Sequence, residues 1–444
     1  MPTPGRPAPG GPAYLAAQRA DLLRFAAGSR LERGFGYLDG DGVVDPARPV
    51  ELWITCRMTH VASLGLLADE PPAPGGPDRT ALAALAAHGV TSLTGPTTGP
   101  TTGLADPRHG GWFAAVGADA ADGVVDDTKQ AYGHAFVVLA AASATAAGVD
   151  GAAVLLRHAL DVLTARFWDD DEGLVVDAWD RGWTRLDDYR GVNANMHTVE
   201  ALLAAGDVLG GVLGDVVGAA RLHHRAGRIA ARVVVWARAH QWRIPEHFTP
   251  SWQPLPEHHR EVPAHPFQPY GATVGHGLEW SRLLVAVDQT LGQQAPAGLV
   301  AAAVALADRA VTDGWAPDGA DGFVYTTDWN GVAVVRSRMH WVAAEAVNTA
   351  CVLHRVTGEE RWRELGAQWW AYVDRHLVDH QRGSWIHELD ERNRPSGETW
   401  PGKPDVYHAY QAALLPCLPT VPSFASALAG GGLGGPWGTG GVSR

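Results

Sequence analysis

Long stretches rich in alanine, leucine and valine alternate along the chain with short segments of glycine and aromatic residues. In the long stretches, apolar side chains recur every three to four positions, which is the period of an amphipathic α-helix. Alanine at this density favours helix formation and lets helices approach one another closely. The pattern predicts a helix beginning at Trp53 and further helices over residues 13–27, 80–93, 130–147, 152–167, 196–209, 219–241, 277–291, 298–312, 339–357 and 361–376.

The short glycine and aromatic segments return at a spacing of roughly 60 to 75 residues, at Gly111, Gly173, Gly322 and Gly383, with residues 248–252 in the gap. Each interval holds about two helices, and no strand–helix alternation is present that would build a parallel sheet. A helix pair repeated about six times predicts an all-α fold, an (α/α)6 barrel with short β-hairpin loops over one mouth. An open helical-repeat scaffold is the alternative.

The domain organisation is predicted to be simple, because large barrels fold as one unit. Residues 13–425 of the 444-residue chain form the barrel domain. Residues 1–12, rich in proline and glycine and without an apolar core, are expected to be disordered and are not a signal peptide. Residues 426–444 are expected to be a glycine-rich flexible tail.

Three irregular stretches, residues 71–77, 94–106 and 245–271, interrupt the helical pattern, and the first two are expected to be surface loops. The last is long and leads directly into the segment that carries His276. Long loops in compact domains are usually functional or disordered, so this one is expected to form part of a site rim.

The net charge of -13 argues against nucleic acid or a membrane surface as partner, because both need a basic patch. No apolar run approaches the length of a membrane span, and a cytoplasmic protein, monomeric or homodimeric, is expected. The 18 Trp residues fit two interpretations. They stack on sugar rings in a cleft, or they fill a large helical core.

His276 and Glu279 are three residues apart on a predicted helix and therefore share a face. His408 follows far downstream, in a segment dense with hydrogen-bonding and aromatic side chains. Two histidines, one steered by a carboxylate, suit the movement of a proton off and onto carbon. The same residues also suit metal binding or plain packing.

Two further pairs are four residues apart and share a helix face, Trp53 with Arg57 and Asn193 with His197. Arg57 suits neutralisation of a developing oxyanion, and Trp53 suits stacking on a sugar. Tyr132 offers a hydroxyl to the barrel interior. The alternatives are an arginine that covers an aromatic ring at the surface and a histidine satisfied within the core.

The sequence lacks the motifs of several common enzyme classes. The chain has no glycine-rich phosphate loop, no Gly-x-Ser-x-Gly elbow and no Cys-x-x-Cys pair. A glycoside hydrolase needs two flanking carboxylates, and Asp126, Asp127 and Glu279 form no obvious pair. A metal site from His197, Glu279 and the two histidines named above is an alternative. Hard cations prefer carboxylate clusters, none is evident in the sequence, and no metal or cofactor is expected.

Seven segments between Trp53 and Gln411 resemble the N-acylglucosamine 2-epimerase superfamily, and within it the branch of mannose and sulfoquinovose isomerases. The most specific is Gly402-Lys403-Pro404-Asp405 ahead of His408, which is similar to the aldose–ketose isomerases. The segments are residues 53–60, 106–112, 126–136, 193–200, 276–280, 383–390 and 402–411.

This resemblance implies an (α/α)6 barrel and a cofactor-free enzyme that acts on a monosaccharide through a cis-enediol intermediate. The expected reaction interconverts D-mannose and D-fructose, with D-lyxose and D-xylulose as a further pair. Sulfoquinovose isomerisation and 2-epimerisation remain alternatives. His408 matches the base at C1/C2, His276 with Glu279 matches the second acid/base group, and Arg57 matches the charge-stabilising residue. The matching substrate-binding residues are Trp53, Tyr132, Asn193, Met196, His197, Trp341 and His387.

Overall fold

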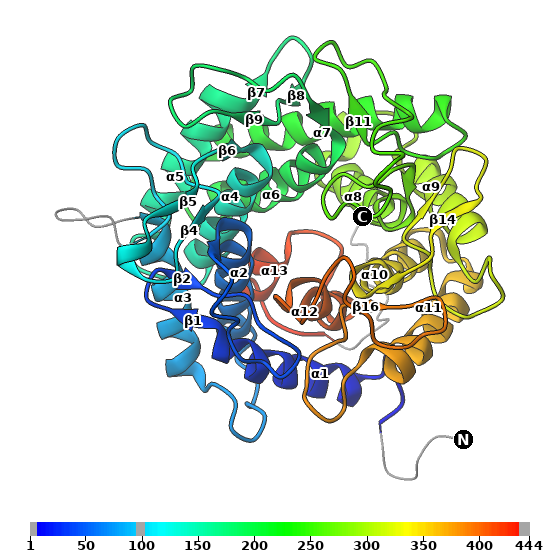
Figure 1. Ribbon diagram of the computed structural model, residues 1–444, viewed down its shortest axis with the longest axis horizontal. Coiled ribbons are helices and arrows are strands. Elements are labelled where there is room, and N and C mark those ends of the chain that lie inside the picture. Colours follow the sequence, from blue (N-terminus) through cyan, green and yellow to red (C-terminus); the bar gives the residue numbers. More distant parts are fainter. Residues whose placement is uncertain (1–6, 95–102, 435–444) are drawn as a thin grey trace.

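Two concentric rings of helices make up the molecule, as a computed structural model that describes residues 7–94 and 103–434 shows (Figure 1). The inner ring contains α2 (Leu52–Ala68), α4 (Ala131–Ala146), α6 (Val192–Gly211), α8 (Val274–Leu291), α10 (His340–Thr357) and α12 (Tyr407–Leu414). The outer ring contains α1 (Pro12–Ala26), α3 (Arg79–Thr94), α5 (Ala152–Val162), α7 (Val216–Ala239), α9 (Leu299–Gly314) and α11 (Glu360–Tyr372).

The inner helices pack against one another in chain order, and α12 contacts both α10 and α2, which closes the ring. Each inner helix also packs against an outer helix, for example α6 against α7 and α8 against α9. The predicted (α/α)6 barrel is therefore confirmed. Short π-helical turns, Leu163–Phe167 and Val373–Leu377, extend α5 and α11.

Burial explains which helices form the inner ring. Every residue from Leu52 to Leu66 of α2 is buried, and the alanine-rich α4 is nearly as enclosed. The outer α7 instead buries one stripe, which includes Leu222, Ile229 and Val233. A helix that is apolar all round belongs in the interior, whereas an amphipathic helix covers it.

Short antiparallel strands gather at one mouth of the barrel and fix where the inner helices begin. Five strands end immediately before an inner helix: β3 (Val50–Glu51), β6 (Lys129–Gln130), β10 (Arg190–Gly191), β12 (Ala272–Thr273) and β15 (Arg338–Met339). Their partners are β4 (Ala115–Val116), β9 (Ala178–Trp179), β11 (His247–Phe248), β13 (Thr326–Thr327) and β16 (Glu388–Leu389). The first turns of the inner helices therefore lie at this mouth.

The remaining short elements complete the loops. Strands β5 (Val124–Asp126) and β14 (Ala333–Val335) add third strands to β4 and β13. Two hairpins pair β1 (Arg30–Leu31) with β2 (Gly34–Phe35) and β7 (Trp168–Asp169) with β8 (Leu174–Val175). Single 3-10 turns cover Ala27–Ser29, Ala120–Asp122, Gly292–Gln294 and Leu415–Cys417.

The chain ends differ in part from expectation. Helix α13 (Phe424–Ala429) contacts α2, α4 and α6, so the expected tail boundary at residue 425 falls inside a packed helix. Residues 7–11 are described ahead of α1, and Gly10 lies against Trp370. Residues 1–6, 95–102 and 435–444, which include parts of the expected disordered segment, loop and tail, lie outside the described residues. Among the described residues, no helix is long and apolar enough to cross a membrane.

Candidate active site

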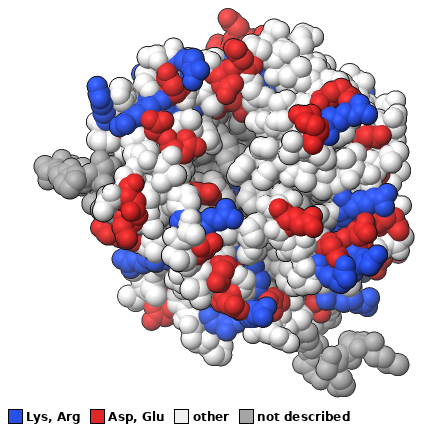
Figure 2. All heavy atoms as spheres, in the orientation of Figure 1, with Lys and Arg blue, Asp and Glu red and all other residues white. Residues whose placement is uncertain are grey.

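A pocket of about 660 Å³ opens at the mouth that carries the strands. The molecular surface is hollowed near the centre of this face, with charged side chains of both signs around the hollow (Figure 2). The expected site residues line this pocket, with Met196 as the exception. The lining residues are Trp53, Arg57, Tyr132, Asn193, His197, Pro266, Phe267, Pro269, His276, Glu279, Tyr325, His340, Trp341, His387, Trp400, Pro404, Asp405 and His408.

Most of these side chains come from the first two turns of the inner helices, which the strands hold at the mouth. Gly275, in the first turn of α8, shows how closely the elements approach there. A Cβ atom at this position would overlap the ring of Trp341 on α10. The absence of a side chain at Gly275 therefore lets Trp341 lie beside His276, with 5.3 Å between their ring centroids.

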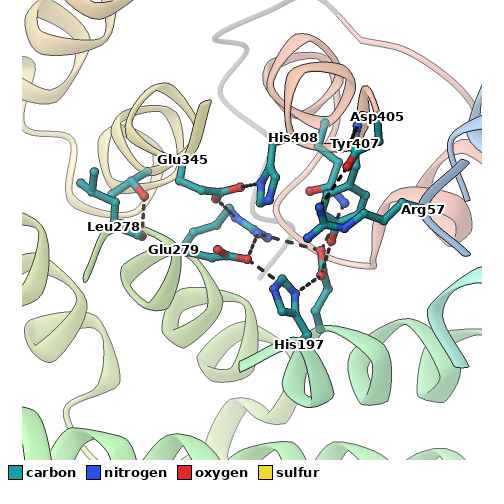
Figure 3. Close-up of polar contacts among 12 residues, drawn as sticks. Arg57, His197, Leu278, Glu279, Glu345, Asp405, Tyr407 and His408 are labelled. Carbon is teal, nitrogen blue, oxygen red and sulfur yellow. Dashed lines mark hydrogen bonds and ion pairs between the residues drawn. The ribbon is translucent and has the colours of Figure 1, made fainter. Parts of the chain in front are cut away.

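His408 is held by a buried carboxylate. Its Nδ1 lies 3.1 Å from Glu345 Oε1, and Glu345 is fully buried on α10 (Figure 3). An ionised Glu345 accepts the Nδ1–H, which leaves Nε2 of the ring unprotonated and free to accept a proton. Burial lowers the pKa of His408, although Glu345 opposes this effect. His408 is therefore a neutral base at neutral pH.

His276 is held by a different carboxylate from the one expected. Its Nδ1 lies 2.8 Å from Glu246 Oε1, in the segment just before β11. The expected pairing of His276 with Glu279 is not found, because the carboxyl group of Glu279 lies instead 3.9 Å from His197 Nδ1 and 3.7 Å from Arg282 Nη2. Helical spacing puts two side chains on one face but does not exclude a closer partner from another element.

Three buried carboxylates, from Glu200, Glu279 and Glu345, surround the guanidinium group of Arg282 beneath the pocket. Burial opposes ionisation of Glu200 and Glu345, but their cationic and hydrogen-bonding neighbours hold both pKa values below the ordinary range. Burial and the neighbouring Glu345 raise the pKa of Glu279 well above its ordinary value. The surroundings therefore favour the protonated form of Glu279 and the ionised forms of the other two carboxyl groups.

Arg57 supplies positive charge at the pocket wall. Its guanidinium lies 3.1 Å from Asp405 and 2.9 Å from the hydroxyl of Tyr132. The group also lies over the rings of Phe136 and Tyr407, at 4.6 and 4.7 Å from their centroids. These contacts fix the charge in place before any ligand binds.

Several polar atoms of the pocket are suited to sugar hydroxyl groups. The Oδ1 atom of Asn193 and the Nε2 atom of His340 are buried without a hydrogen-bond partner. Burial lowers the pKa of His197 to about 4 and that of His387 to about 3, so both rings are neutral at neutral pH. Neutral imidazoles and amides can each donate or accept a hydrogen bond.

An aromatic rim encloses the top of the pocket. Phe267, from the long loop of residues 245–271, lies 6.3 Å from Trp53 and 5.2 Å from Trp400 between ring centroids. The expectation that this loop forms part of the site rim is confirmed, since Pro266, Phe267 and Pro269 line the pocket.

Comparison with known proteins decides the family. The N-acylglucosamine 2-epimerase (GlcNAc 2-epimerase) family pattern matches residues 34–412. The chain belongs to the N-acylglucosamine 2-epimerase family. The resemblance inferred from the sequence is thereby confirmed.

Members of the family with curated names are similar over nearly the whole chain. A D-mannose isomerase from Thermobifida fusca is 49% identical over 420 residues, which is 94% of this chain and 97% of the relative. A D-mannose isomerase from Pseudomonas cannabina pv. alisalensis is 42% identical, over 94% and 95%. A crystal structure of D-mannose isomerase superposes with a TM-score of 0.79 at 25% identity, over 92% of this chain and 98% of that one.

In this member of the family, Met196 and the two aspartates considered for a glycoside hydrolase lie away from the pocket. Met196 is fully buried in the core and does not line the pocket, because consecutive residues on a helix point about 100° apart and its neighbour His197 faces inward. Asp126 and Asp127 do not line the pocket either, and Asp126 accepts hydrogen bonds from Thr128. The carboxylate pair that a glycoside hydrolase needs is therefore not formed by these residues.

Sequence reasoning missed the residues that hold the two histidines. Glu246, Glu345 and Arg282 are buried and paired, and none belongs to a local motif. Arg282 and Glu345 offered one signal, because each is a charged residue next to apolar residues within its helix. A charge in such a position is rarely buried unless it is paired.

The structure also contains a cluster of carboxylates, although none was evident in the sequence. Two groups of three residues could each offer ligand atoms within 4.8 Å of one another. One group is His197, Glu200 and Glu279, and the other is Glu279, Glu345 and His408. Arg282 contacts all three carboxylates, with its Nε 2.9 Å from Glu345 Oε2. A divalent cation there would meet this fixed positive charge, so the donor set does not fit a metal ion.

Proposed function

We propose that this protein is an aldose–ketose isomerase that interconverts D-mannose and D-fructose. The observation that carries the proposal is the pair of histidines in one pocket, His408 held by buried Glu345 and His276 held by Glu246, with the carboxyl group of Glu279 in the same lining. The two full-length relatives named D-mannose isomerase support the choice of sugar.

The reaction begins with opening of the sugar ring. His276, oriented by Glu246, accepts the proton of the anomeric hydroxyl, while protonated Glu279 donates a proton to the ring oxygen. The open-chain aldehyde now has an acidic C2–H bond. His276 carries a positive charge at this stage, and the carboxylate of Glu246 stabilises it.

Proton transfer between carbons follows. His408 Nε2 removes the C2 proton, and negative charge develops on O1, where Arg57 and the hydroxyl of Tyr132 can stabilise it. His276 returns its proton to O1. His408 then delivers its proton to C1, while ionised Glu279 takes the proton of the O2 hydroxyl. The product is the ketose, and every side chain regains its starting state.

The charges of the lining favour a neutral sugar over a sulfonated one. Among the described residues that line the pocket, Arg57 is the cation outside the histidines, and Asp405 neutralises it. A sulfonate group needs additional cationic or donor side chains around it. D-mannose therefore fits the lining better than sulfoquinovose does.

Incubation with D-mannose in D2O, followed by proton NMR, tests the function. We expect D-fructose to form, with deuterium entering at C1 wherever His408 exchanges its proton with solvent. His408→Ala should lower both isomerisation and loss of the C2–H signal by roughly 10²- to 10⁴-fold. His224→Ala, an exposed position on the outer helix α7, should keep full activity.

Two results would contradict the proposal. Formation of D-glucose without D-fructose would identify a 2-epimerase, in which C2 receives the proton. Activity of His408→Ala within about tenfold of the wild type would exclude this side chain as the carbon base.

A further inference from the structure

Arg282 does not line the pocket, yet it lies at the centre of the charges that control His408. It projects from α8 and is 5% exposed. Its Nε lies 2.9 Å from Glu345 Oε2, while Glu345 Oε1 lies 3.1 Å from His408 Nδ1. A single buried carboxylate on α10 thus joins a guanidinium on α8 to an imidazole on α12.

The charges around this contact make Arg282 necessary to keep Glu345 ionised. Glu200 and Glu279 lie on its other side, 3.9 and 3.7 Å from its Nη2. Without the guanidinium, buried Glu345 would face two further carboxyl groups with no fixed cation in contact. A carboxylate that loses an opposite charge at this distance binds a proton more readily, by roughly 1 to 3 pKa units.

Other charged and titratable groups around His408 do not replace Arg282. Arg57 from α2 is paired with Asp405, which precedes α12. His340 from α10 and His387 lie on the remaining side, and burial keeps both in the neutral form. Tyr407 donates its hydroxyl to Glu200 rather than to Glu345.

An extra proton on the pair formed by Glu345 and His408 has the same consequence whichever of the two residues binds it. If Glu345 becomes a carboxylic acid, it donates to Nδ1, and the neutral imidazole carries its proton on Nε2. If His408 becomes an imidazolium, Nε2 is again protonated. Either outcome blocks the nitrogen that faces the substrate.

We propose that Arg282 is a positioning residue that keeps Glu345 ionised and so holds His408 with an unprotonated Nε2 toward the substrate. The inference rests on the proposed role of His408 as the base. It assigns a function in the reaction to a residue that touches neither the substrate pocket nor His408 itself.

The test compares Arg282→Met with Arg282→Lys. In Arg282→Met, the acid limb of the kcat/KM profile should move to higher pH by roughly 1 to 3 units, with activity recovered at alkaline pH. Arg282→Lys keeps the charge, so its acid limb should stay within about half a unit of the wild type on the same scale. A merely structural role would damage both variants without moving the midpoint.

The ring nitrogens provide a readout that does not depend on activity. In protein with ¹⁵N-labelled histidine, the His408 signals are assigned by their loss in His408→Gln. At neutral pH, Nε2 should be unprotonated in the wild type and in Arg282→Lys, and protonated in Arg282→Met. This measurement holds even if the protein acts on another sugar, so failure of the proposed function and failure of this inference are distinguishable.

Arg19→Met is the matched control, because Arg19 is a buried arginine 2.6 Å from Glu70 and away from the pocket. It should lower stability and leave the midpoint and the His408 signals unchanged. If Arg282→Met does not fold, Arg282→Met with Glu279→Gln is compared with Glu279→Gln alone, and the same upward shift is required. An unshifted midpoint with unprotonated Nε2 in the folded variant would overturn the proposal.

Discussion

At the scale of single residues, burial pushes the proton affinities of neighbouring side chains in opposite directions. Burial lowers the pKa of His408, whereas burial and the neighbouring Glu345 raise the pKa of Glu279. One pocket therefore favours a proton acceptor at His408 and a proton donor at Glu279. Pairs of titratable groups whose pKa values are driven apart are typical of acid–base catalysis.

The partner of His276 leads to a prediction for Glu246. Glu246→Gln keeps a hydrogen-bond acceptor for Nδ1–H but removes the charge that stabilises the imidazolium formed during ring opening. A hydrogen bond to a charged group contributes about 1.5–3 kcal/mol, so kcat/KM should fall about 10- to 100-fold. Steady-state kinetics with D-mannose measure this loss, and KM should change much less than kcat.

Glu279→Gln separates the two possible partners of His276. This variant should also lose activity, because it removes a proton donor from the pocket. It should leave the ¹⁵N signals of His276 unchanged, whereas Glu246→Gln should shift them. The reverse pattern would restore the pairing of His276 with Glu279 that helical spacing suggested.

At the scale of the elements, local sequence patterns predicted much of the fold and part of the site. Helical periodicity predicted the helices, because each buries a continuous stripe or a whole surface. The helix expected to start at residue 196 instead begins at Val192, since Asn195 lies inside α6 and its side chain bonds Val175 and Gly191. An asparagine just before a predicted helix is more often an N-cap than a residue whose side chain hydrogen-bonds a neighbouring strand.

The residues that sequence reasoning missed depend on contacts between elements. Trp53, Arg57 and His197 lie at helix starts, in polar and aromatic segments that can be recognised locally. Glu345 and Arg282 lie on two different helices, α10 and α8, and their pairing exists only because the ring brings those helices together. No spacing along one helix encodes such a partner.

The close approach of α8 and α10 predicts different outcomes for two glycines. In Gly275→Ala the new Cβ would overlap the Trp341 ring and displace it from His276. Overpacking of this kind costs about 1–3 kcal/mol of stability, and activity should fall with it. In Gly277→Ala the new Cβ would lie 3.4 Å from Ala310 Cβ, a tolerable contact.

Urea unfolding and kinetics of the two variants test this interpretation. Gly277→Ala should be neutral or stabilising by up to about 1 kcal/mol, because alanine favours helix over glycine. Its activity should match that of the wild type. Equal losses in both variants would show that α8 tolerates no side chain at either position and that Trp341 is not the specific cause.

At the scale of the whole molecule, ring closure joins residues that are distant along the chain. Arg57 near the start of the barrel pairs with Asp405 near its end, 348 residues away, through the contact of α2 with α12. Helix α13, from the end of the described chain, packs against α2, α4 and α6. The site therefore forms only when the ring is complete, which ties the site to global folding.

The buried histidines predict that stability falls on acidification. Burial lowers the pKa of His60 and His197 to about 4, and of His134, His247 and His387 to about 3. An unfolded histidine has a pKa of about 6.5. Between about pH 6.5 and pH 4 the unfolded chain therefore binds protons that the folded protein excludes, so stability rises with pH across this window.

Buried carboxyl groups act in the opposite direction. Burial raises the pKa of Glu51 and Asp177 to about 7, so the folded protein binds protons there that the unfolded chain releases above about pH 4. The buried neutral histidines outnumber these groups and Glu279, so the free energy of unfolding still rises with pH across this window. Each unmatched proton changes the free energy of unfolding by about 1.4 kcal/mol per pH unit.

Urea unfolding at pH 7, 6 and 5 measures this slope, and two variants should change it in opposite senses. His134→Gln removes one proton that only the unfolded chain binds, so the loss of stability between pH 6 and 5 should become smaller. Asp177→Asn keeps the acceptor for Gly191 N–H but removes an opposing proton, so the loss should become larger. A free energy of unfolding that stays level or rises from pH 7 to pH 5 would contradict the neutral burial of these histidines.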